Sequence, residues 1–238
     1  MEQLLTIIAY TSLAGFALPA GGLLAGIERL SPHWLEQEFR HGVLAFGGGI
    51  LLAGVALVLV PHGKRELTVV AAIASLISGG LFFLAIDRSL TLAGRSASNL
   101  IAALLDFIPE AIALGALIST QASLGTLLAM FIGLQNLPEG FNAYRELVAS
   151  KDTTKTGAMV LLTASALLGP FCGVLGYWVL SDAPLATSVT MLFAAGGILY
   201  LVFQDIAPQA RLASHWGPPL GAVLGFALGL SGTMLMQG

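Results

Sequence analysis

Residues 97–120 read ASNLIAALLDFIPEAIALGALIST, an apolar run of membrane-spanning length that nevertheless contains two acids, Asp106 and Glu110. A span needs about 20 predominantly apolar residues, because an α-helix rises about 1.5 Å per residue through a hydrocarbon core roughly 30 Å thick. A charged side chain at the centre of such a helix costs roughly 2.5–3.5 kcal/mol on insertion scales. The run therefore predicts a transmembrane helix whose two acids serve a function.

The rest of the chain has the composition of an integral membrane protein. Of its 238 residues, 56% are hydrophobic and only 10% are charged, whereas soluble domains carry about 25% charged residues. Seven further apolar runs reach span length. We predict an all-α integral membrane protein with a single transmembrane domain over residues 1–238. Its eight helices are expected at residues 5–27, 39–61, 67–86, 97–120, 122–148, 156–181, 186–209 and 216–236.

Basic residues gather on one side of the predicted bundle. The odd-numbered loops carry Arg29, Arg40, Arg88, Arg95, Arg145, Lys151, Lys155 and Arg211, and the opposite side has Lys64 and Arg65. Because cytoplasmic loops hold the positive excess, we expect both termini on the extracytoplasmic face of the cell (inner) membrane. The surroundings are then the lipid bilayer. The small net charge of −3 does not favour nucleic-acid binding, and no obligate soluble partner is expected.

Two glycine-rich helices look like copies of each other. Residues 46–52 read FGGGILL in a run that leads to Pro61, and residues 193–199 read FAAGGIL in a run that leads to Pro208. Residues 19–24 (PAGGLL) similarly resemble residues 170–175 (PFCGVL) in helix 6. Helices 1 and 6 enter the membrane from opposite sides. We therefore predict an inverted repeat of helices 1–3 and 6–8 around helices 4 and 5, a 3+2+3 arrangement typical of secondary transporters.

Helices 4 and 5 contain a second internal repeat. Residues 106–111 read DFIPEA and residues 135–140 read QNLPEG. The i, i+4 spacing places Asp106 and Glu110 on one helix face and Gln135 and Glu139 on another, so four oxygen donors can converge. The spans offer no Lys or Arg to pair with the acids, so a divalent cation, protons or both must compensate them. The alternative is that the acids are protonated and hydrogen-bond neighbouring helices.

Polar residues extend this predicted site along the bundle. The candidate pathway residues are Asn99, Asn136, Asn142 and Glu146 on helices 4 and 5, Asp205 on helix 7, and His62 after helix 2. Asn142 and Glu146 continue the face of Glu139 towards the cytoplasm and are expected to form an exit route. Asp205 is a candidate gate residue, and His62 could collect metal at the outer mouth. Simple solvation of such helix-end residues is the alternative.

The two motifs resemble those of the ZIP (Zrt/Irt-like) family of metal transporters. In that family the fourth helix usually reads His-Asn-x-Pro-Glu-Gly and the fifth His/Gln-Asn/Asp/Glu-x-Pro-Glu/His. Eight spans, outward termini and glycine-rich second and seventh helices agree with the family along the whole chain. The resemblance implies uptake of zinc or related divalent ions, with the ion as transported substrate, a homodimer, and an elevator-like movement of helices 1, 4, 5 and 6.

The chain departs from the family pattern in ways that bear on selectivity. Asp106 stands where the family usually has histidine, which leaves only oxygen donors in the predicted site. Carboxylates and carbonyls suit harder ions such as Mn, whereas imidazole suits Zn, Cu and Ni. We expect zinc to be accepted, with selectivity that is broad or shifted towards Mn, Fe and Cd, and with Co as another candidate. Phe107 replaces the asparagine of the family's second metal site, so a single site is predicted.

Other functions remain as alternatives. A proton-coupled metal exporter would use the same residues, because sequence does not fix the direction of flux. A carrier for a small organic cation would also need acids within the membrane, but it should surround them with aromatic side chains, and only Phe107 and Phe141 are near. The chain has no HExxH helix or nucleophile elbow, so we do not predict an enzyme.

Overall fold

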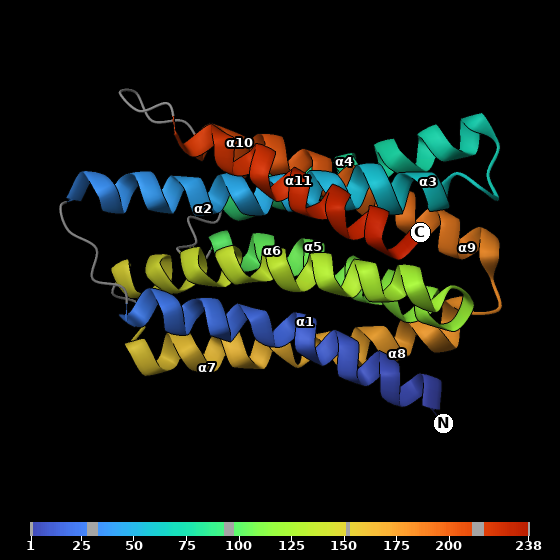
Figure 1. The fold of residues 1–238 in the computed structure, drawn as a ribbon, viewed down its shortest axis with the longest axis horizontal. Coiled ribbons are helices and arrows are strands. Elements are labelled where there is room, and N and C mark those ends of the chain that lie inside the picture. Colours follow the sequence, from blue (N-terminus) through green and yellow to red (C-terminus); the bar gives the residue numbers. More distant parts are fainter. Residues whose placement is uncertain (1, 28–32, 93–97, 151–152, 211–216, 238) are drawn as a thin grey trace.

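The computed structural model describes residues 2–27, 33–92, 98–150, 153–210 and 217–237, which are almost entirely helical (Figure 1). The elements in chain order are α1 (Glu2–Ile27), α2 (His33–Ala53), η1 (Gly54–Leu59), α3 (Val60–Gly63), α4 (Val69–Leu92), α5 (Ser98–Thr120), α6 (Ala122–Ala149), α7 (Lys155–Ala166), α8 (Leu168–Leu180), α9 (Pro184–Leu201), η2 (Val202–Ile206), α10 (Ala207–Gln209) and α11 (Pro218–Gln237). Elements α2 to α3, α7 to α8 and α9 to α10 each form one membrane-length segment. The predicted all-α fold with eight such segments is confirmed for the described residues.

Seven of the segments have the length and apolar composition of membrane spans, counting only described residues. The exception is α6, which has 28 residues but carries a polar second half. That half contains Gln135, Asn136, Glu139, Asn142 and Glu146. The helix is long enough to cross with its neighbours, and its extensive packing against α1 places it inside the bundle. Its low hydropathy reflects side chains that face protein rather than lipid.

Helices α5 and α6 lie at the centre of the bundle. Figure 1 shows them between a layer of α1, α7 and α8 and a layer formed by α2 to α4 with α9 to α11. Within its most apolar window, 61% of α5 is buried, against 17% for each of α4 and α11. The duplicated motif therefore lies on helices well inside the bundle, and α4 and α11 present most of their surface to lipid.

The packing divides the helices into two groups. The first helix group contains α1, α5, α6, α7 and α8, which pair mainly as α1 with α6 and α5 with α8. The second helix group contains α2 to α4 and α9 to α11, which pair mainly as α2 with α11 and α4 with α9. These pairings follow the predicted repeat. If the first three segments are exchanged with the last three, and α5 with α6, the α1–α6 pair becomes the α5–α8 pair and the α2–α11 pair becomes the α4–α9 pair. The inverted repeat as a symmetry relation stays a prediction.

Both glycine-rich segments contain a π-helical turn just before a proline. Element η1 precedes Pro61, and η2 precedes Pro208. A proline ring clashes with the carbonyl four residues earlier and removes a hydrogen bond. Those carbonyls belong to Leu57 and Gln204, which lie inside the two π-helical turns. The wider turn relieves the clash while the segment continues, so each segment crosses the bundle without a break.

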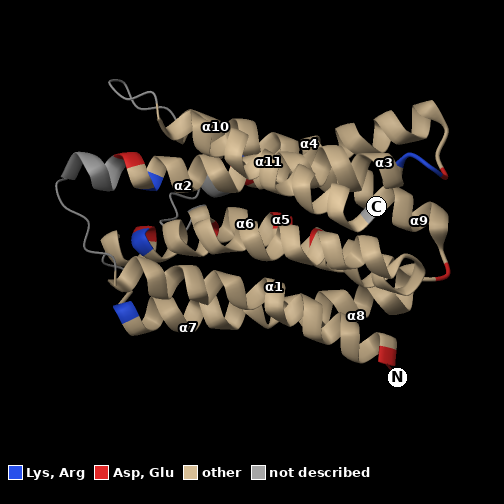
Figure 2. Cartoon of the chain, in the orientation of Figure 1, with Lys and Arg blue, Asp and Glu red and all other residues tan. Residues whose placement is uncertain are grey.

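Both chain ends lie at the same end of the bundle (Figure 1). We call this end the terminal side and the other end the loop side. Of the basic residues used to predict orientation, Arg29, Arg95, Lys151 and Arg211 lie outside the described residues. The described Lys and Arg residues lie near the two ends of the bundle (Figure 2). Which side faces the cytoplasm stays a prediction.

Candidate functional site

The duplicated motif lies midway along two antiparallel helices. Helix α5 runs from the loop side to the terminal side and contains Pro109, and α6 runs in the opposite direction and contains Pro138. Both helices continue through their prolines. Each proline nevertheless removes one hydrogen bond from its helix. The two motifs therefore face each other at mid-bundle, where Asp106, Glu110 and Gln135 are each at most 3% exposed.

The four predicted donors form two pairs that the repeat relates to each other. Gln135 donates from Nε2 to Oε2 of Glu110 over 2.6 Å. The carboxyl groups of Asp106 and Glu139 lie within hydrogen-bonding reach of one another, and the Glu110 carboxyl is close to both. Two carboxyl groups in such contact need a proton or a cation between them, because two adjacent negative charges repel. Each pair joins α5 to α6.

One carboxyl oxygen in the site stands apart from the others because it lacks a partner in the part of the chain that the structure describes. Oε2 of Glu139 is buried and makes no hydrogen bond among the described residues. Asp106 is better satisfied, since its Oδ1 accepts from the backbone N–H of Phe107 over 2.9 Å. A buried acceptor without a partner costs about 1–3 kcal/mol. Glu139 is therefore the member of the set with the most to gain from a cation.

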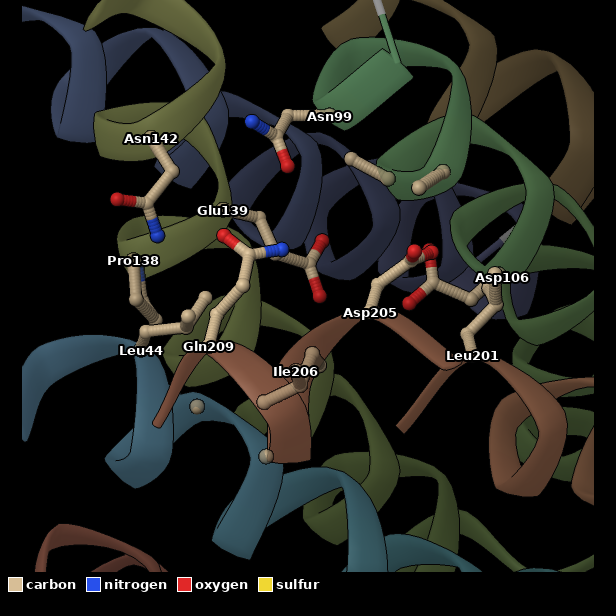
Figure 3. Close-up of a pocket in the computed structure, with 14 residues that line it drawn as sticks. Leu44, Asn99, Asp106, Pro138, Glu139, Asn142, Leu201, Asp205, Ile206 and Gln209 are labelled. Carbon is tan, nitrogen blue, oxygen red and sulfur yellow. The ribbon is translucent and has the colours of Figure 1, made fainter. Parts of the chain in front are cut away.

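A small cavity lies on the loop side of the prolines. It has a volume of about 40 Å³, which is enough for a water-sized guest. Figure 3 shows Asp106, Glu139 and Asp205 around it, with Asn99 and Asn142 further along. Nδ2 of Asn142 is buried and has no hydrogen-bond partner within the described ranges of the chain. The lining residues are Leu44, Gly47, Gly48, Asn99, Ala102, Ala103, Asp106, Pro138, Glu139, Asn142, Leu201, Asp205, Ile206 and Gln209.

The cavity thus brings together five residues singled out in the sequence and leaves others elsewhere. Glu110 and Gln135 lie deeper and do not line it. Asn136 is fully buried, donates to the carbonyl of Ala14 over 2.9 Å, and so ties α6 to α1. Glu146 accepts from the backbone N–H of Asn99 over 2.8 Å at the start of α5. These two side chains have packing and capping contacts in place of contact with the cavity.

His62 also lies away from the cavity. It is 8% exposed, and its Nδ1 is 2.7 Å from the carbonyl oxygen of Val58. It follows the lining residue Gly48 by 14 positions, which is roughly 20 Å along a helix. His62 was predicted to collect metal at the outer mouth. In the structure its ring lies on the terminal side of the bundle, but it is buried and held by a contact with its own segment.

One polar contact near the cavity was not anticipated from the sequence. The Tyr200 hydroxyl donates to Oδ2 of Asp87 over 2.8 Å and links α9 to α4. The charges of Asp87 and Glu146 both act on Asp205, so the loop-side end of the cavity is acidic. The two residues are 113 positions apart, so no local pattern in the sequence indicates the contact.

The donors do not yet surround a single point. No group of three or more His, Cys, Asp and Glu side chains in the described parts of the chain is arranged to hold a metal ion. Gln135 is not oriented to bind a cation either, because its contact with Glu110 turns its amide nitrogen towards the carboxylate. An amide nitrogen donates and does not bind cations. Gln135 must present Oε1 before all four donors can bind one ion.

Phe107 fills the space beside the site. Its ring is fully buried between α1 and α8, where a Cβ on Gly15 or Gly169 would lie 3.0 or 2.7 Å from its Cζ. The two glycines therefore make room for the ring. A phenyl group offers no metal ligand, and the neighbouring Asn136 amide is held by α1. The surroundings of Phe107 are apolar packing.

Comparison with known families decides the class of protein. The family described as ZIP Zinc transporter matches residues 90–237, more than half of the chain. The chain belongs to the ZIP zinc transporter family. The matched range runs from the end of α4 to α11 and includes both copies of the motif. No match was found among curated proteins. This ZIP protein is a multi-pass membrane protein that transports divalent metal ions.

Proposed function

We propose that this ZIP protein moves divalent transition-metal ions into the cytoplasm through a single site formed by Asp106, Glu110, Gln135 and Glu139. The proposal rests above all on the buried carboxyl groups of Asp106 and Glu110 at mid-bundle, together with a buried oxygen of the partly buried Glu139 that has no partner among the described residues. The Lys and Arg residues visible in Figure 2 lie towards the bundle ends, whereas these acids lie at mid-bundle. A divalent cation balances two carboxylates, and a proton balances the third.

Loading of the site requires its donors to come together around one ion. The three acids must converge and the Gln135 amide must turn over, so that its Oε1 joins the oxygens of Glu110, Asp106 and Glu139. The ion replaces the contact between Asp106 and Glu139 and gives Oε2 of Glu139 its missing partner. Binding then displaces protons from the carboxyl groups, so metal and protons compete. Competition of this kind supports coupling of metal and proton movements.

The donor chemistry supports selectivity wider than zinc. The four side chains offer only oxygen, because Asp106 replaces the histidine usual in the family. Oxygen ligands suit Mn and other hard ions, whereas imidazole favours Zn. We propose that Zn, Mn, Fe, Cd and Co compete for the site. Phe107 supports a stoichiometry of one ion per chain, since it fills the adjacent space with a buried apolar ring.

The cavity supports release towards the loop side. Glu139 and Asp106 belong to both the predicted site and the cavity wall, so an ion leaving them enters the cavity directly. Asp205 lies beside Asp106 on the cavity wall, and Asn99 and Asn142 lie further along the cavity (Figure 3). They offer oxygens to an ion that sheds its ligands one by one. If the loop side is cytoplasmic, as the positive-residue count favours, this movement is uptake.

Glycine contacts support a movement of one helix group against the other. In the described chain, every glycine at which a Cβ would meet another helix's backbone makes that contact within one group. In the first group, a Cβ on Gly140 would lie 2.0 Å from the oxygen of Leu18. In the second, a Cβ on Gly49 would lie 2.1 Å from the oxygen of Ala222. Such close approach of backbones holds the helices of one group together. Between the two groups, the described glycines contact only side chains.

Metal uptake into proteoliposomes tests the proposal. We expect the Glu110→Ala, Glu139→Ala double variant to lose saturable uptake of Zn and Mn, because two of three carboxylates are gone. Glu66→Ala is the matched control, since Glu66 is an exposed acid outside the helices. The control should retain uptake. Uptake at the unmodified rate by the double variant would rule out the site.

A further inference from the structure

The two copies of the motif differ in the helical turn that precedes them. Asp106 aligns with Gln135, so Asn99, Ala102 and Ala103 of α5 align with Leu128, Phe131 and Ile132 of α6. The α5 residues all line the cavity. The α6 residues are at most 1% exposed and belong to the hydrophobic core. Equivalent positions of one repeat are thus small or polar in one copy and large and apolar in the other.

Because α5 and α6 are antiparallel, this difference between the two copies becomes a difference between the two sides of the site. In α5 the preceding turn lies on the loop side of the motif, and in α6 it lies on the terminal side. The loop side of the site therefore has a cavity, whereas the face of α6 that carries Gln135 is filled with side chains on the terminal side. A second pocket, of about 400 Å³, lies on a different face of this half of α6, against α1, and none of Leu128, Phe131 and Ile132 lines it. Phe131 is one turn from Gln135 on the same face of α6. Phe131 and Ile132 are the nearest large side chains to Gln135 on that face in the direction of the terminal side.

Phe131 sits in a socket made by three glycines of the second helix group. A Cβ on Gly54, Gly229 or Gly232 would lie 3.6, 3.4 or 3.7 Å from an atom of the Phe131 ring. Gly54 begins η1, and the other two glycines belong to α11. The ring belongs to the first group and the socket to the second. Any sliding of one group along the other must take the ring out of its socket.

We infer that Phe131, flanked by Leu128 and Ile132, is the plug that closes the terminal-side path to the metal site. The inference rests on the proposed function, because the path it closes leads to the proposed site. The plug holds the protein in the conformation described here, in which the cavity lies on the loop side of the site. When the Phe131 ring leaves its socket, the terminal-side path opens and the glycine surface becomes exposed. Opening of the path and sliding of the two helix groups therefore occur together.

A cysteine-accessibility experiment tests the plug. Cys172 is the sole cysteine, so Cys172→Ser with Gln135→Cys provides one probe thiol next to the plug. A charged, membrane-impermeant methanethiosulfonate is applied to each face of the membrane in turn. We expect Phe131→Ala to speed modification from the terminal side by about tenfold or more, since truncating a buried aromatic shifts equilibria by factors of that size.

Phe83→Ala is the matched control. Phe83 is 1% exposed and also packs on a glycine, Gly197, but both belong to the second group. It should leave terminal-side modification unchanged. Equal acceleration in both variants, or none in Phe131→Ala, would overturn the plug. Ala102→Phe gives a second test, because it should slow modification from the loop side, and an unchanged rate would also contradict the inference. The assay involves no metal, so the plug and the proposed metal site can fail separately.

Discussion

Replacing Gly140 with alanine should loosen the first helix group. The new Cβ would lie 2.0 Å from the carbonyl oxygen of Leu18 and 2.7 Å from two other backbone atoms of that residue. Ordinary contact begins near 3.4 Å, so the separation between α1 and α6 must open by about 1.4 Å. A radial gap of 0.5–1 Å already forfeits about a quarter to a half of a dispersion contact. The hydrogen bond from Asn136 to Ala14 lies on the same interface.

Gly42→Ala provides the matched control. A Cβ at Gly42 in α2 meets nothing within 4 Å. Both substitutions gain the same helix propensity of about 1 kcal/mol, so the difference between the two variants isolates the clash. Overpacking of this kind costs about 1–3 kcal/mol. For a chain of this size, 1 kcal/mol corresponds to about 2–4 °C in Tm.

Thermal unfolding in detergent measures this difference. We expect Gly140→Ala to melt about 2–12 °C below Gly42→Ala. Its uptake rate should fall as well, because α1 and α6 no longer move as one unit. Equal Tm values for the two variants would refute the reasoning that close glycine contacts hold the first helix group together.

Three other outcomes follow from the site. Asp106→His should raise the preference for Zn over Mn in competition uptake, because imidazole is the better zinc ligand; an unchanged ratio would place Asp106 outside the donor set. Metal binding should release protons and tighten as pH rises, because protonated carboxyl groups must lose their protons to bind metal; calorimetry in buffers of different ionisation enthalpy should show this, and zero release would contradict shared protonation. Glu146→Ala should lower the free energy of unfolding by about 0.5–2 kcal/mol, because the backbone N–H of Asn99 loses its cap, and should leave metal affinity unchanged. A weaker metal affinity would show that Glu146 contributes to the ion pathway.

Periodicity and composition predicted the helices because lipid imposes the same rule on every span. Each must be long, apolar and internally hydrogen-bonded. The same rule made Asp106, Glu110 and Glu139 conspicuous. The pairing of the motifs followed from their repeat, since antiparallel neighbours with the same spacing face each other. The family match then assigned the chain to the ZIP transporters.

The features that the sequence did not indicate are long-range contacts. Asn136 meets Ala14 across 122 positions, and Tyr200 meets Asp87 across 113. No periodicity encodes such partners, so Asn136 was interpreted as a pathway residue. The π-helical turns were also missed, although Pro61 and Pro208 provided a signal at the right spacing. The glycine socket of Phe131 could not be predicted, because three separate turns of two helices create it.

The central claim is that buried carboxyl groups at mid-bundle bind the transported ion. Metal content after equilibration with Zn, Mn, Fe or Cd, measured on purified protein by elemental analysis, tests it most directly. We predict one tightly held divalent ion per chain in the unmodified protein and none in the Glu110→Ala, Glu139→Ala variant. The same metal content in both proteins would contradict the claim.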